Sequence, residues 1–92
     1  GFLDQVQDKA AYLQGQLKSA LIDKASVTQI RGLGLMIGIQ TTADLASIVT
    51  KAREKGLIVL TAGVDVVRLL PPLTLTKEEI DRGVAILADC FE

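Results

Sequence analysis

The chain has 92 residues, a formal net charge of −1 and no histidine; 49% of its residues are apolar and only 3% are aromatic. This length supports a single domain, residues 1–92, with an aliphatic core that buries roughly 60–65% of the unfolded chain's surface. The balanced charge excludes the basic footprint of a nucleic-acid-binding protein, and the apolar runs are too short to span a membrane.

The first half of the chain predicts a helix, a hairpin and a second helix. Apolar residues recur every three or four positions from Phe2 to Ile22, the spacing of a helix with one buried stripe. The β-branched run Val27–Gln40 predicts two strands joined by a tight turn at Arg31–Gly34. Thr41 and Asp44 are spaced as a capping pair for a second helix, which ends at Gly56.

The second half predicts two strands and a third helix. Leu57–Leu60 has the composition of a short buried strand, and Thr61–Gly63 that of a turn. The strand that follows contains Arg68 and stops at two consecutive prolines, Pro71 and Pro72. Thr76–Glu79 has the sequence of a capping box, and it precedes a helix whose apolar stripe is Ile80, Val84, Leu87, Ala88 and Phe91.

The order α-β-β-α-β-β-α predicts an α+β fold, with a small, mostly antiparallel sheet of three to four strands and helices on one face. The other face is expected to meet a partner, because so small a domain has little interior in which to hide its apolar residues.

Most chemical motifs in the sequence favour a structural interpretation. The glycines at 32, 34 and 38 resemble a phosphate-binding loop, but a strand-like run follows them where such a loop needs a helix. Cys90 lies among apolar neighbours with no histidine to activate it, and a lone cysteine fits a reducing cytoplasm. The charged residues show no metal-site pattern, and no lysine has the apolar setting of a Schiff-base lysine.

Arg68 is the one residue for which a functional interpretation competes with a structural one. Its neighbours Val66, Val67, Leu69 and Leu70 make both faces of the strand apolar, so the guanidinium is expected to be buried. A buried guanidinium needs an anionic partner, unless its fork reaches a solvent cleft. That partner is either a neighbouring carboxylate, Asp65 or Glu79, or the carboxylate of a ligand, which the planar fork binds with two parallel hydrogen bonds.

Three stretches then make the chain recognisable: Ile30–Ile39, Ala52–Leu60 and Val66–Asp81, with Val67-Arg68-Leu69-Leu70-Pro71-Pro72-Leu73 the most specific. In this order they resemble the C-terminal part of the class III aminotransferases. The resemblance is greatest to members that act on N-acetylornithine, through Leu60–Gly63 and Val67–Leu73, although members that use ornithine, succinylornithine or 4-aminobutyrate share the layout.

The resemblance implies a small C-terminal domain of a cytoplasmic, homodimeric enzyme that uses pyridoxal phosphate. It implies that Arg68 binds the α-carboxylate of the amino-acid or oxo-acid substrate. The family's catalytic lysine and its cofactor-binding residues belong to a large domain, so no catalytic or cofactor-binding residue is expected within Gly1–Glu92. The segment alone is therefore expected neither to bind the cofactor nor to transaminate. The rival hypothesis is a stand-alone α+β interaction module that uses its bare sheet face.

Overall fold

The computed structural model describes residues 2–33, 36–70 and 74–91. These residues form three helices and four strands in the predicted order. The elements are α1 (Phe2–Leu21), β1 (Val27–Leu33), β2 (Met36–Thr41), α2 (Leu45–Glu54), β3 (Leu60–Ala62), β4 (Val66–Leu69) and α3 (Lys77–Cys90).

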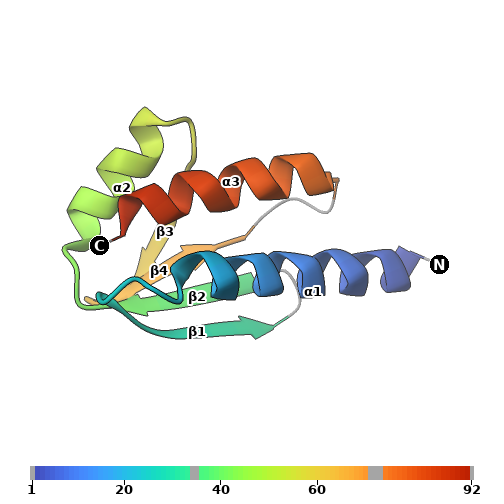
Figure 1. Ribbon diagram of the computed structural model, residues 1–92, viewed down its shortest axis with the longest axis horizontal. Helices are drawn as coiled ribbons and strands as arrows, with labels where there is room; N and C mark the ends of the chain where they lie inside the picture. The colour runs from blue at the N-terminus through green and yellow to red at the C-terminus, as the bar shows by residue number, and fades with distance from the viewer. Residues whose placement is uncertain (1, 34–35, 71–73, 92) are drawn as a thin grey trace.

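The four strands form one antiparallel sheet in the order β1-β2-β4-β3. Figure 1 shows α1 and α3 lying side by side along the sheet, with α2 packed near the C-terminal end of α3. The predicted α+β fold with helices on one face is confirmed. Strand β4, which carries Arg68, lies between β2 and β3 in the interior of the sheet. The order of the strands along the sequence does not predict this position.

The core lies between the helices and one face of the sheet. In β2 the side chains alternate, so that Ile37, Ile39 and Thr41 are buried beneath the helices while Met36, Gly38 and Gln40 belong to the other face. Val67 of β4 is fully buried on the helix side. The buried helix residues are aliphatic and sulfur-containing: Ala10, Leu13, Leu17, Leu21, Ile48, Ala52, Ile80, Val84, Leu87 and Cys90.

The hairpin is longer than its sequence predicts. Strand β1 continues through Arg31 and Gly32 to Leu33, so the turn does not begin at Arg31. Gly32 and Gly38 both lie within strands, so neither opens a helix as a phosphate-binding loop does, while Gly34 lies outside the described residues. The side chain of Gln14 occupies the space where a Cβ at Gly32 would stand, which lets α1 lie close over β1.

Helix α2 begins later than its capping pair predicts. Asp44 is the N-cap and accepts a hydrogen bond from the Ser47 backbone N–H at 3.3 Å. Thr41 is instead the buried last residue of β2, and its hydroxyl accepts from the Ala43 N–H at 3.1 Å. The pairing of Thr41 with Asp44 is therefore wrong. The end at Gly56 is correct, because that residue has φ +92°, a conformation that other residues rarely adopt.

The third strand is displaced relative to its prediction. Residues 57–59 are not in a strand, Val59 alone among Leu57–Leu60 is fully buried, and Ile58 is 79% exposed. The strand begins at Leu60 and includes Thr61 and Ala62, where the sequence predicts a turn. A short edge strand needs no continuous apolar run, which is why the composition of Leu57–Leu60 was misleading.

Helix α3 begins as its sequence predicts. The Thr76 hydroxyl accepts from the Glu79 N–H at 3.2 Å, and the Glu79 carboxylate accepts from the Thr76 N–H at 3.1 Å. Both halves of the capping box are present. Pro71, Pro72 and Leu73, which the sequence places at the end of the arginine strand, lie outside the described residues.

Candidate functional site

The sheet face opposite the helices carries a row of four residues, one from each strand. Arg31 of β1 pairs with Gly38 of β2, Gly38 pairs with Arg68 of β4, and Arg68 pairs with Leu60 of β3. Directly paired residues project from the same face of a sheet. The two arginines therefore flank Gly38 on the face that none of the described helices covers, which we call the open face.

Arg68 is exposed, so the prediction that it is buried is wrong. The sequence shows apolar neighbours on both sides of the strand, but helices cover only the face that carries Val67. On the open face Val66 is only half-buried, and Leu60, which pairs with Arg68, is 58% exposed. The guanidinium thus remains hydrated here, and within this domain its charge needs no partner.

Neither carboxylate proposed as an internal partner for Arg68 binds it. Asp65 accepts a hydrogen bond from the amide nitrogen of Gln40 at 2.9 Å. The Glu79 carboxylate is held in the capping box by Thr76, whose N–H and hydroxyl lower its pKa. The side chain of Arg68 makes neither a hydrogen bond nor an ion pair with the described residues, so its fork is available to a group from outside them.

Arg31 is the residue of this row that sequence reasoning missed. It is exposed, and its side chain too makes no hydrogen bond or ion pair with the described part of the chain. The turn predicted at Arg31–Gly34 removed it from the strand. A hairpin that pairs Leu33 with Met36 instead places Arg31 opposite Gly38, so the signal was the register of the hairpin.

A shallow hollow of about 200 Å³ lies over Gly38, and its lining residues are Gln29, Arg31, Gly38, Gln40 and Val66. Gly38 does not have a positive φ, and a Cβ there would meet only the Val66 Cγ1 atom, at an ordinary 3.5 Å. Neither the backbone nor the packing of the described residues therefore requires glycine at this position. The hollow combines guanidinium and amide groups, which suits a polar or anionic occupant.

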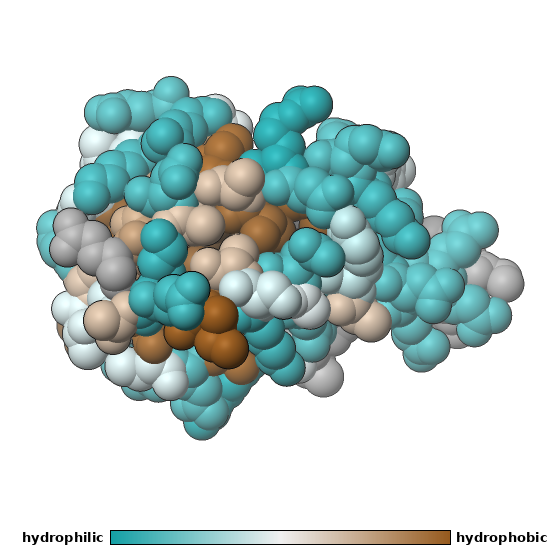
Figure 2. Space-filling model, in the orientation of Figure 1, coloured by the Kyte–Doolittle hydropathy of each residue, from teal (hydrophilic) through white to brown (hydrophobic). Residues whose placement is uncertain are grey.

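A second depression is apolar and lies between α1, α3 and the end of β4. It measures about 190 Å³, and its lining includes Leu13, Leu17, Leu69, Leu75 and Val84. Figure 2 shows apolar side chains between the hydrophilic helix surfaces on this side of the molecule. This depression lacks a grouping of polar atoms that could perform chemistry, and it lies on the helix side, away from the arginine row.

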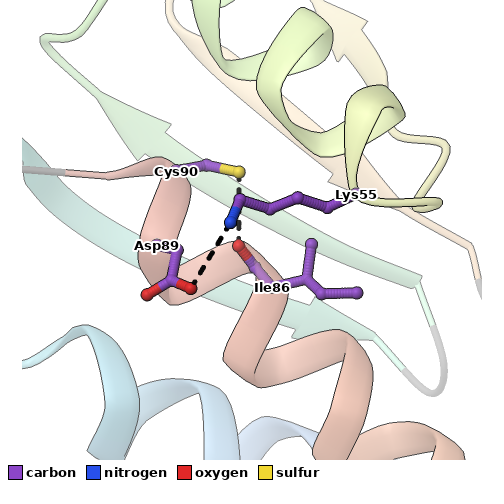
Figure 3. Close-up of polar contacts among 4 residues, drawn as sticks. All are labelled: Lys55, Ile86, Asp89 and Cys90. Carbon is purple, nitrogen blue, oxygen red and sulfur yellow. Dashed lines mark hydrogen bonds and ion pairs between the residues drawn. The ribbon is translucent and has the colours of Figure 1, made fainter.

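Cys90 and its surroundings are structural, as Figure 3 shows. Its thiol is 3% exposed and donates to the Ile86 carbonyl at 3.2 Å, and burial raises the pKa of the thiol. Nearby, Lys55 Nζ lies 3.7 Å from the Asp89 carboxylate, with both side chains largely in solvent. Such an exposed pair contributes about 0–1 kcal/mol. Neither group has the setting of a nucleophile.

Other kinds of site find no support among residues 2–33, 36–70 and 74–91. No group of three or more carboxylates and thiols there could hold a metal ion. None of the lysines of these ranges is buried, so none has the apolar setting of a Schiff-base lysine. No described helix is both long and apolar enough to cross a membrane.

Comparison with known proteins gives consistent results along the chain. The family model described as aminotransferase class-III matches residues 1–91. Acetylornithine aminotransferase from Streptococcus mutans is 63% identical over 92 residues, all of this chain and 24% of that protein. The enzyme of the same name from Listeria innocua is 44% identical, again over all of this chain and 24% of its own length.

A solved structure agrees with the sequence relatives. The ornithine delta-aminotransferase of Plasmodium falciparum superposes with a TM-score of 0.90 at 30% identity, covering 97% of this chain and 24% of that one. The chain thus spans about a quarter of the length of the relatives it matches.

Proposed function

This chain belongs to the class-III aminotransferase family, and we propose that it is the C-terminal small domain of an acetylornithine aminotransferase. The parent enzyme, meaning the longer protein of which these residues are one domain, transfers an amino group between N-acetylornithine and 2-oxoglutarate in arginine biosynthesis. The names of the Streptococcus mutans and Listeria innocua relatives support this choice of amino donor over ornithine, succinylornithine and 4-aminobutyrate. The family match over residues 1–91 favours an enzyme domain over a stand-alone interaction module.

Within the parent enzyme, Arg68 binds the α-carboxylate of the substrate. The observation that carries this assignment is an exposed guanidinium on the open face, with no partner among the described residues. Its neighbours Val66 and Leu60 are apolar, so a second domain that covers this face removes water and strengthens the contact with the carboxylate. The bidentate pair fixes the orientation of the substrate and places its amino group for reaction.

Pyridoxal phosphate does not fit the described residues of this chain. A covalently held aldehyde cofactor needs a desolvated lysine, and no lysine among these residues is buried. The large domain of the parent, a homodimer, supplies the cofactor, which provides the electron sink for transamination. The role of this chain is to bind and orient the substrate and to cover the site.

Arg68→Ala in the parent enzyme tests the assignment. Hydrogen bonds to charged groups contribute about 1.5–3 kcal/mol, so KM for both the amino acid and the oxo acid is expected to rise roughly ten- to a hundredfold. Arg68→Lys keeps the charge but loses the fork, so its KM values are expected to lie between those of the natural enzyme and those of Arg68→Ala. Arg53→Ala removes an exposed arginine from α2, away from the open face, and should leave both constants unchanged.

Unchanged KM values for both substrates in Arg68→Ala would remove Arg68 from the site. The choice of amino donor is tested separately, by comparing kcat/KM for N-acetylornithine, ornithine, succinylornithine and 4-aminobutyrate in the same enzyme. A higher value for any donor other than N-acetylornithine would overturn the name given to the parent.

A further inference from the structure

Arg31 and the hollow over Gly38 are not used by the function proposed above. Arg31 is exposed, and its side chain lacks a hydrogen bond or ion pair within the described residues. The Asp65 carboxylate, which accepts from the Gln40 amide nitrogen, makes no ion pair with it. The hollow therefore presents an unpaired guanidinium, and the strongest interaction of that group is with an anion.

The packing and backbone of the described residues do not require glycine at position 38. The space above the sheet at this position is the remaining reason for it. A Cβ at this position would make one ordinary contact, with Val66, and the residue has no positive φ. Glycine in a strand interior weakens the strand, because it costs backbone entropy and packs no side chain. Glycine at this position would allow an occupant to approach β2 closely from the open face.

The rest of the parent enzyme is the occupant that best fits the open face. The chain spans 24% of the length of its Streptococcus mutans relative, so in an enzyme of that length about three-quarters of the polypeptide lies outside these residues and is available to cover the open face. Near the hollow, Met36 is 45% exposed and Leu60 is 58% exposed, and a covering domain would bury both. A desolvated interface around Arg31 would in turn require a carboxylate opposite it.

We propose that a segment of the parent enzyme outside these 92 residues docks on the open face and places an aspartate or glutamate carboxylate over Gly38, where Arg31 binds it. This inference rests on the function proposed above. Arg31 is then a positioning residue. Its ion pair fixes β1 against the large domain. Strand β1 is joined through β2 to the strand of Arg68, by the pairing of Arg31 with Gly38 and of Gly38 with Arg68.

Kinetics of the full-length enzyme separate this role from substrate binding. Arg31→Ala is expected to lower kcat/KM about tenfold for amino acid and oxo acid alike, and to lower the Tm of the enzyme by 2 °C or more. Arg31→Lys should restore most of both losses, whereas Arg31→Glu should be worse than Arg31→Ala. Arg53→Ala, the matched control on α2, should leave both quantities unchanged.

Gly38→Ala is an independent variant that keeps every charge. This domain accommodates the added Cβ, so any loss must come from what lies above the sheet. The variant is expected to reproduce the lower Tm and kcat/KM of Arg31→Ala. Gly15→Ala, which adds a Cβ in open space on α1, should not reproduce them.

Chemical cross-linking identifies the partner carboxylate directly. In the Arg31→Lys enzyme a carbodiimide should join the new amine to an aspartate or glutamate outside this segment, and peptide mass spectrometry should identify the link. Arg53→Lys should give no such link. A link from position 31 to a carboxylate within this segment, or no link together with an unchanged Tm in Arg31→Ala, would overturn the proposal.

Selective loss of affinity for the oxo acid in Arg31→Ala, at unchanged Tm, would mean that Arg31 binds substrate, and it too would overturn the proposal. These outcomes leave the function of the parent untouched. If the enzyme transaminates N-acetylornithine and Arg68→Ala raises both KM values, only the docking role of Arg31 has failed.

Discussion

The capping box of α3 predicts a pH-dependent contribution to stability. Thr76→Ala removes the hydroxyl that accepts from the Glu79 N–H and also removes its hydrogen bond to the Glu79 carboxylate, at 3.0 Å. Loss of an N-cap costs about 0.5–2 kcal/mol. For a domain of this size each kcal/mol corresponds to about 4–8 °C in Tm, so Thr76→Ala is expected to lower Tm by roughly 2–16 °C at pH 7.

The carboxylate half of the box gives the sign of the pH dependence. Hydrogen bonds from the Thr76 N–H and hydroxyl lower the pKa of Glu79 below its ordinary value of 4.5. The native state therefore favours the ionised carboxylate, and this contribution is present above about pH 4.5 and is lost as pH falls through the lowered folded pKa. The stability gap between the natural chain and Glu79→Ala should accordingly be largest at pH 7 and should narrow at pH 3.

Thermal unfolding followed by circular dichroism at pH 7 and pH 3 measures both effects. Glu78→Ala is the matched control, because it removes a carboxylate from the same helical turn without touching the capping hydrogen bonds. Its gap to the natural chain should be smaller than that of Glu79→Ala at pH 7. A Glu79→Ala gap that stays constant or widens between pH 7 and pH 3 would refute the assignment of the carboxylate to the cap.

Three further predictions follow from other contacts. Gly15→Ala should stabilise the chain by about 0.5–1 kcal/mol in chemical denaturation because its Cβ stands in open space, whereas Gly32→Ala should give no gain because its Cβ would displace Gln14; equal gains would refute the contact. The Tyr12 hydroxyl donates to Asp81, which raises the pKa of Tyr12 above 10.0; its contribution is therefore present below pH 10 and lost as pH rises through the raised value, so the stability gap to Tyr12→Phe should shrink in a melting series taken above pH 10. Titration of the isolated chain with pyridoxal phosphate should give no absorption band of a lysine-bound cofactor, and a saturable band would contradict the assignment of the cofactor to the large domain.

Local signals predicted the order of the helices and strands, while the pairing of the strands and the face that the helices cover could not be inferred from the sequence. The Thr76–Glu79 box and Gly56 determine helix ends through contacts only a few residues apart, so their residue types suffice. Thr41 also has the spacing of a helix-capping residue, yet it is the last residue of β2. The placement of β4 between β2 and β3 depends on long-range pairing, for which no local pattern exists.

The misplacement of Arg68 has the same origin and changes the physical basis of its assignment. A run of apolar neighbours predicts a buried strand only if both faces are covered, and in this domain the helices cover one. The carboxylate partner is therefore not required by the folding of these 92 residues, as burial would have made it. It is required only when another domain removes water from the open face, since two guanidiniums in one row then lose their hydration together. Under the two proposals above, Arg31 would meet an anion for the same reason as Arg68: docking would neutralise one charge of the row and substrate binding the other.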